Sequence, residues 1–82
     1  MDSDYINESL NKYLGYRLSK EGMREFERVT ARCSQAEFIS SLEITEHNLK
    51  QEAAKESRHR YLCGVLWNKI KKRELTLDGY FE

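Results

Sequence analysis

Residues 34–51 read SQAEFISSLEITEHNLKQ, and the predicted fold of the whole chain depends on this stretch. Ser34 and Glu37 form a capping box, in which each side chain accepts a hydrogen bond from the other residue's backbone N–H at a helix start. Phe38 and Leu42 follow at helical spacing, and Thr45 is a new candidate for a helix cap. We therefore expect one short helix that ends near Leu42 and a second helix that begins near Thr45.

Two helices joined by so short a turn must cross steeply and share one apolar core. This arrangement is the plan of a helix-turn-helix unit. The residues expected in the shared core are Phe38, Ile39, Leu42, Ile44 and Leu49.

The segments on either side of this unit are also predicted to be helical. A first helix is expected from Ser3 or Asp4 to a stop at Gly15, and a second from a cap at Ser19 to about Arg32. Because the chain has no Pro, and no Gly between residues 45 and 63, the helix from Thr45 is expected to continue to about residue 72. Residues 74–82 are predicted as a short extended tail, either a strand or an arm that packs on the core or a partner.

The sequence therefore predicts a single all-α domain over residues 1–82. It is expected to be a small bundle of about four helices, with a central helix-turn-helix-like unit and a long C-terminal helix. Between Tyr61 and Ile70 apolar residues cover most of the circumference of that helix. Such a segment is expected either to be largely buried or to face both its own core and a second molecule. Gly64 within it either lets another helix approach closely or marks a kink.

Composition excludes several classes of protein. The longest nearly apolar run, Tyr61–Trp67, is too short to span a bilayer, and the N-terminal residues lack the basic and apolar segments of a signal peptide. Cys33 and Cys63 have no tight spacing, which fits reduced thiols better than a disulfide framework. A cytoplasmic protein that does not enter a membrane is therefore expected.

Catalytic and metal-binding patterns are weak. His59 and Cys63 are four residues apart and share a helix face, which could hold two metal ligands. Neither Cys33 nor His47 is placed by any spacing to complete a tetrahedral site. The sequence has no Gly-rich phosphate loop, no nucleophile elbow and no helical metalloprotease pair. We predict no enzyme activity, no cofactor and no metal ion.

The central stretch resembles the helix-turn-helix of Cro and repressor-like DNA-binding proteins of bacteria and phages. Ser34, Gln35 and Glu37 match the opening of that family's second helix, and Glu43 lies at the turn, where the family prefers glycine. The remaining matches are core and turn positions, namely Phe38, Leu42, Ile44, Thr45 and Leu49. The resemblance implies a small phage-like regulator of transcription that binds double-stranded DNA.

The helix starting near Thr45 would then enter the major groove. Its exposed start carries His47, with Lys50 placed to contact guanine or phosphate and Gln51 placed to pair with adenine. Lys55 and Arg58 add positive charge along the same helix, and residues 45–74 carry a net charge of +4 in a chain of zero net charge. Such a charge favours phosphate contact, although the pI of about 6.7 is low for a DNA-binding domain.

A protein-binding module is the alternative. Tyr61 and Trp67 in the C-terminal helix, with Tyr80 and Phe81 in the tail, belong to residue types that are common anchors of interfaces. The chain would then be an adaptor, an inhibitor or a homodimer. Aromatic residues at helical spacing are also common in a protein's own core, and the sequence leaves this choice open.

Overall fold

The computed structural model describes the backbone of residues 1–49 and 53–81 and the side chains of these ranges as far as residue 72. Within these ranges the chain forms four helices and no strand: α1 (Ser3–Leu14), α2 (Lys20–Thr30), α3 (Gln35–Asn48) and α4 (Lys55–Phe81). The predicted all-α fold of about four helices with a long C-terminal helix is confirmed. Nowhere in the described chain is there a helix long and apolar enough to cross a membrane.

Local hydrogen bonds set most of the helix ends. Ser34 Oγ accepts from the backbone N–H of Glu37 at 3.1 Å, and Glu37 Oε1 accepts from the N–H of Ser34 at 2.9 Å, so the predicted capping box is present. Ser19 caps α2 as expected, whereas α2 ends two residues before Arg32. Asp2, rather than Ser3 or Asp4, caps α1, and Gly15 ends α1 with a φ of 76°.

The turn expected between Leu42 and Thr45 does not exist, because α3 runs without interruption from Gln35 to Asn48. Thr45 is fully buried and lies inside the helix, where its hydroxyl donates to the backbone oxygen of Ser41 at 2.8 Å. Its hydroxyl thus bonds to the preceding turn instead of capping a new helix. The chain leaves the helix at Leu49, which is extended with a ψ of 136°.

The core lies where all four helices meet. α4 packs against α3 and α2, and α1 packs against α3. Apolar side chains from every helix and from the α1–α2 connector are buried there: Ile6, Leu10, Leu14, Tyr16, Met23, Phe26, Phe38, Leu42, Leu62, Leu66 and Ile70. Of the predicted shared core, Phe38 and Leu42 are buried and Ile39 and Leu49 are half-buried, whereas Ile44 is 37% exposed.

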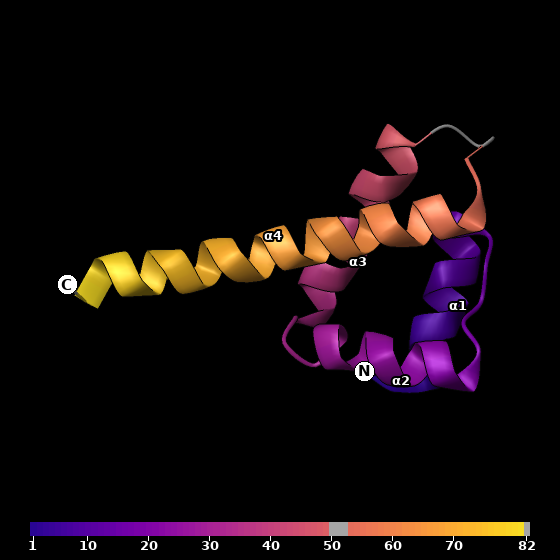
Figure 1. The fold of residues 1–82 in the computed structure, drawn as a ribbon, viewed down its shortest axis with the longest axis horizontal. Helices are drawn as coiled ribbons and strands as arrows, with labels where there is room; N and C mark the ends of the chain where they lie inside the picture. Colours follow the sequence, from indigo (N-terminus) through magenta and orange to yellow (C-terminus); the bar gives the residue numbers. More distant parts are fainter. Residues whose placement is uncertain (50–52, 82) are drawn as a thin grey trace.

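α4 determines the overall shape. Its 27 residues extend past the other three helices, which gather around its N-terminal half, so that the C-terminal part of α4 projects alone (Figure 1). The molecule is consequently elongated, with principal dimensions of 44 × 26 × 18 Å. The extended tail predicted for residues 74–82 is wrong as far as residue 81, which ends the helix. Once a helix is nucleated, each further residue adds a backbone hydrogen bond, and this favours continuation.

Candidate functional site

The residues predicted to read DNA are not brought together on one helix. His47 lies in the last turn of α3, whereas Lys55 begins α4, and Lys50 and Gln51 lie outside the described residues. Arg58 is half-buried, and its Nη1 donates to the backbone oxygen of Leu14 at 2.8 Å. This contact satisfies a carbonyl at the C-terminal end of α1, which gives Arg58 a structural role in joining α1 to α4.

A different surface emerges on α4, made by Tyr61, Gly64 and Trp67 and here called the outward surface. Both aromatic side chains are 38% exposed. They are six residues apart with Gly64 midway, so at 3.6 residues per turn the glycine lies between them on the side of the helix that faces away from the core. The buried positions of the same helix, Leu62, Leu66 and Ile70, form the opposite stripe.

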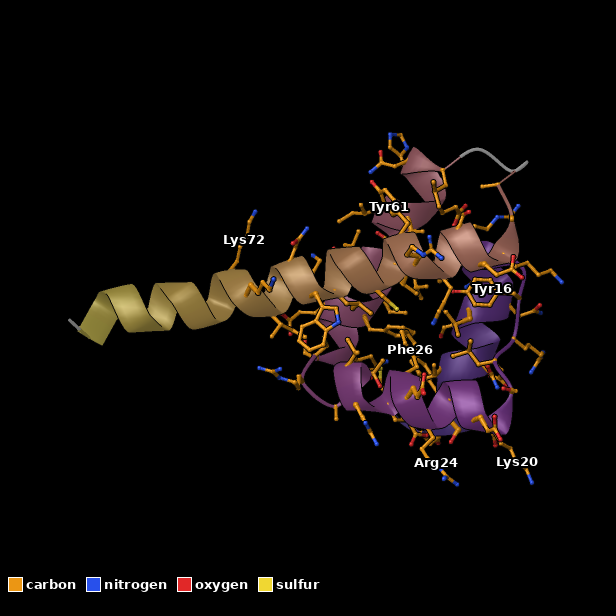
Figure 2. All side chains as sticks on the ribbon, in the orientation of Figure 1. Tyr16, Lys20, Arg24, Phe26, Tyr61 and Lys72 are labelled. Atoms are coloured by element: carbon orange, nitrogen blue, oxygen red, sulfur yellow. The ribbon has the colours of Figure 1, made fainter. Side chains whose placement is uncertain are left out.

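Each aromatic side chain of the outward surface is held by a neighbouring helix or loop. The Tyr61 hydroxyl accepts a hydrogen bond from Asn48 Nδ2 at 3.2 Å, so the ring lies toward the end of α3 (Figure 2). The guanidinium of Arg32 lies 5.4 Å from the centroid of the Trp67 ring, within the range of a cation–π contact. The two rings are therefore partly held in position by contacts within the chain.

Gly64 has no packing role within the described chain. A Cβ built at this position would meet nothing within 4 Å, and the helix continues through it without interruption. The helix therefore has no break at Gly64, and no atom of another helix in the described chain lies within 4 Å of a Cβ built there. A glycine inside a helix costs about 0.8–1.0 kcal/mol relative to alanine, and no contact within the described chain accounts for this cost.

Positive charge is concentrated along α4. Its residues 55–72 contain six Lys or Arg residues and one Glu, which gives a net charge of +5 in a chain of zero net charge.

Large exposed apolar or aromatic side chains are concentrated on α3 and α4. Of the four in the described residues, only Met1 lies elsewhere, and the others are Ile44, Tyr61 and Trp67. The apolar segment of α4 thus contributes both to the core and to an exposed surface.

A second group of polar side chains lies on the other side of α4, at its contact with the α1–α2 connector. The Tyr16 hydroxyl and His59 Nδ1 are hydrogen-bonded at 2.7 Å, and Cys63 Sγ lies 3.6 Å from His59 Nε2. Phe26 packs against the imidazole, with ring centroids 4.9 Å apart. Figure 2 shows Tyr16 and Phe26 directed into the space beside α4.

Burial keeps this group uncharged at neutral pH. It lowers the pKa of His59 below its usual value and raises the pKa of the Cys63 thiol. Burial also raises the pKa of Tyr16, and the neighbouring Cys63 adds to the effect while Arg58 opposes it. A protonated thiol is a poor nucleophile, so the arrangement does not favour covalent catalysis.

His59 and Cys63 share a face of α4, as their spacing predicted, and could provide two metal ligands. Among the described residues no third His, Cys, Asp or Glu lies close enough to complete a metal site. Sequence reasoning missed Tyr16, which is 43 residues from His59 along the chain. No short-range spacing could have found it.

Tyr80 and Phe81, the other two residues predicted to bind a partner, belong to a helix rather than a tail, and their side chains lie outside the described part of the structure. Comparison with protein-family models found no match to the chain, and searches of curated proteins and of solved structures found none either.

Proposed function

We propose that this chain is a helical interaction module that binds a partner protein through the outward surface of α4. The observation that carries the proposal is the exposed Gly64 between two exposed aromatic side chains, on a helix whose opposite face is buried in the core. Tyr and Trp anchor many protein interfaces because they bury a large area at a small entropic cost. A small residue between them allows the backbone of a partner to approach closely.

The charge of α4 favours an acidic partner. The basic side chains on the same side of the helix as Gly64 are Arg60 and Lys71, and both are exposed. Opposite charges steer association and select partners more than they raise affinity. A partner that would fit is an acidic helix with apolar residues on one side, because its apolar side can contact the two rings while its backbone approaches the glycine between them. A second copy of the chain, whose residues 1–49 carry nine acidic and six basic side chains, is one such candidate.

Photo-crosslinking in the native cells tests the proposal. A photoreactive benzoylphenylalanine replaces Tyr61 in one variant and Lys20 in another, because Lys20 points away from the body on the outer side of α2 (Figure 2). We expect a discrete adduct with an acidic protein, or with a second copy, from position 61 only. Adding Gly64→Gln should abolish it, since a Cβ at this position meets nothing within 4 Å in the folded chain and the longer side chain would obstruct the approach of the partner. The proposal fails if position 61 gives no adduct or the same adducts as position 20.

DNA binding is the second candidate, supported by the net charge of +5 over residues 55–72. If the chain binds DNA, the basic side chains of α4 contact the phosphates, and binding to mixed-sequence duplex DNA weakens steeply as the salt concentration rises. The double variant Arg60→Gln, Lys71→Gln should then reduce the salt slope, while Lys20→Gln, Arg24→Gln should not. Absence of binding at low salt excludes this candidate.

We also propose a cytoplasmic location, supported by Cys33 and Cys63, which are not joined in a disulfide.

A further inference from the structure

A cavity of about 580 Å³ opens between the α1–α2 connector and the first turns of α4. Its inner part is formed by Tyr16, His59 and Cys63, and Leu18 of the connector adds an apolar wall. The volume falls within the range of about 300–1,000 Å³ that is usual for small-molecule sites. The cavity has no part in the outward surface of Tyr61, Gly64 and Trp67.

The inner part of the cavity is suited to an apolar group. The Tyr16 hydroxyl is occupied by the hydrogen bond to His59, and the imidazole rests on Phe26. Tyr16, His59 and Cys63 are neutral at pH 7, because burial shifts the pKa of each away from the charged form. An apolar ligand group would therefore displace no ion and would leave no buried charge without a partner.

The rim of the cavity is positively charged. Arg17 of the connector and Lys55 and Arg60 of α4 line it, all three exposed, whereas Glu56 is the one acidic side chain among the lining residues. The cations come from two separate segments and lie around one opening. This arrangement produces a positive potential over a neutral, partly apolar interior, which attracts an anion and disfavours a cation.

We propose that this cavity binds a small organic anion, with its apolar body against Leu18 and Cys63 and its acidic group at Arg17, Lys55 and Arg60. The class includes medium-chain carboxylates and aromatic carboxylates. Tyr61, Gly64 and Trp67 of the outward surface do not line the cavity, and Arg60 is the one residue that takes part in both proposals.

Three probes with the same ten-carbon chain test the proposal: decanoate, decanol and decyltrimethylammonium. Each is titrated below its micelle-forming range into the full chain labelled with ¹⁵N, and backbone amide shifts are followed. We expect decanoate to bind most tightly and to shift the amides of Arg17, Lys55 and Cys63. Decanol should bind about tenfold more weakly and the cation more weakly still, because charged hydrogen-bond partners of a carboxylate contribute about that factor.

Charge variants distinguish binding in the cavity from general attraction of decanoate to cations on the protein surface. Arg17→Gln, Lys55→Gln should weaken decanoate binding about tenfold, the factor expected when the charged partners of a carboxylate are lost, and should leave decanol unchanged. The matched pair Lys20→Gln, Arg24→Gln removes two cations from the outer side of α2, away from the cavity (Figure 2), and should leave both affinities unchanged. Decanoate should also slow the reaction of Cys63 with iodoacetamide in a Cys33→Ser variant, since the bound chain covers the thiol.

Three results would overturn the proposal. Equal binding of decanoate and decanol would show that the rim cations take no part. Shifts centred on Tyr61 and Trp67 would place the ligand on the outward surface instead. Protection of Cys63 by an acidic protein partner but not by decanoate would assign the cavity to a protein interface.

Discussion

Gly64 is the residue whose presence the folded chain explains least. It is exposed, it lies in the interior of α4, and a Cβ there would meet nothing within 4 Å. Gly15 offers the contrast, because its φ of 76° is a conformation that other residues adopt only with strain. One glycine is thus required by the backbone, while the other is required by nothing inside the described chain.

Gly64→Ala is therefore expected to raise the free energy of unfolding by about 0.8–1.0 kcal/mol, the difference in helix propensity between the two residues. Chemical denaturation with urea, followed by circular dichroism, measures the change. Gly15→Ala is the control and should lower stability by roughly 1 kcal/mol, because alanine at positive φ is strained. Destabilisation by Gly64→Ala would instead mean that the position is closely packed.

Burial of His59 makes stability depend on pH. Because burial lowers the pKa of His59 in the folded protein, the unfolded chain takes up a proton first as pH falls through the ordinary histidine value of 6.5. The contribution of His59 is thus present above that value and is lost as pH falls toward the folded pKa. Tyr16 and Cys63 do not titrate in this range, since their pKa values are raised.

We expect the unfolding free energy of the wild type to fall more steeply between pH 7.5 and pH 5.5 than that of His59→Gln, which cannot titrate there. Urea denaturation at several pH values gives the two slopes, and only their difference matters because the variant also loses the bond to Tyr16. Identical slopes for the wild type and His59→Gln would contradict burial of the imidazole.

At the scale of the element, the start of α3 could be predicted from residues close together in the sequence, whereas its full length could not. The capping box joins residues three apart, so Ser34 and Glu37 alone predicted the start of α3 correctly. Its continuation past Leu42 buries Ser41 and Thr45, and no local pattern in the sequence predicts this burial. α3 ends at Asn48 and α4 begins at Lys55, although Leu49, Ala53 and Ala54 between them are good helix formers, so tertiary structure overrides propensity at these three residues.

Substitution at Glu43 distinguishes a continuous α3 from a turn. In a helix-turn-helix unit of the resembled kind glycine is preferred at this position, whereas in the structure Glu43 is an exposed residue inside a helix. We expect Glu43→Gly to be less stable than Glu43→Ala by about 0.8–1.0 kcal/mol. Thermal and urea unfolding of the pair measure the difference. A Gly variant as stable as the Ala variant would restore the turn.

The candidate sites, like α3, could be predicted from the sequence only where they depend on residues close together in the chain. His59 and Cys63 share a helix face because they are four residues apart, and this was evident from the sequence. Their contact with Tyr16 joins segments 43 residues apart and depends on how α4 packs against the connector. Tyr61 and Trp67 were recognised by residue type, but apolar residues surround that part of α4. Only the fold decides which of them remain exposed.

At the scale of the whole molecule, α4 is both the largest contributor of charge and the element that leaves the body. Three helices gather around its N-terminal half, and the remainder projects beyond them (Figure 1). A single helix in water gains little stability from its own backbone bonds, since most helical stability in proteins comes from packing. We therefore expect the projecting part to contribute little to the folding of the body.

Deleting residues 74–82 tests this division. We expect the free energy of unfolding to change by less than about 0.5 kcal/mol, the range of substitutions away from packed features. Ile70→Ala, which truncates a fully buried side chain of the same helix, should instead cost about 2–5 kcal/mol. Urea denaturation compares the two. If the deletion costs as much as Ile70→Ala, the last residues of α4 pack against the body.

If the deletion costs little stability and photo-crosslinking from position 61 persists, the outward surface alone is sufficient for binding. If the crosslink disappears while stability is kept, the projecting part of α4 belongs to the interface.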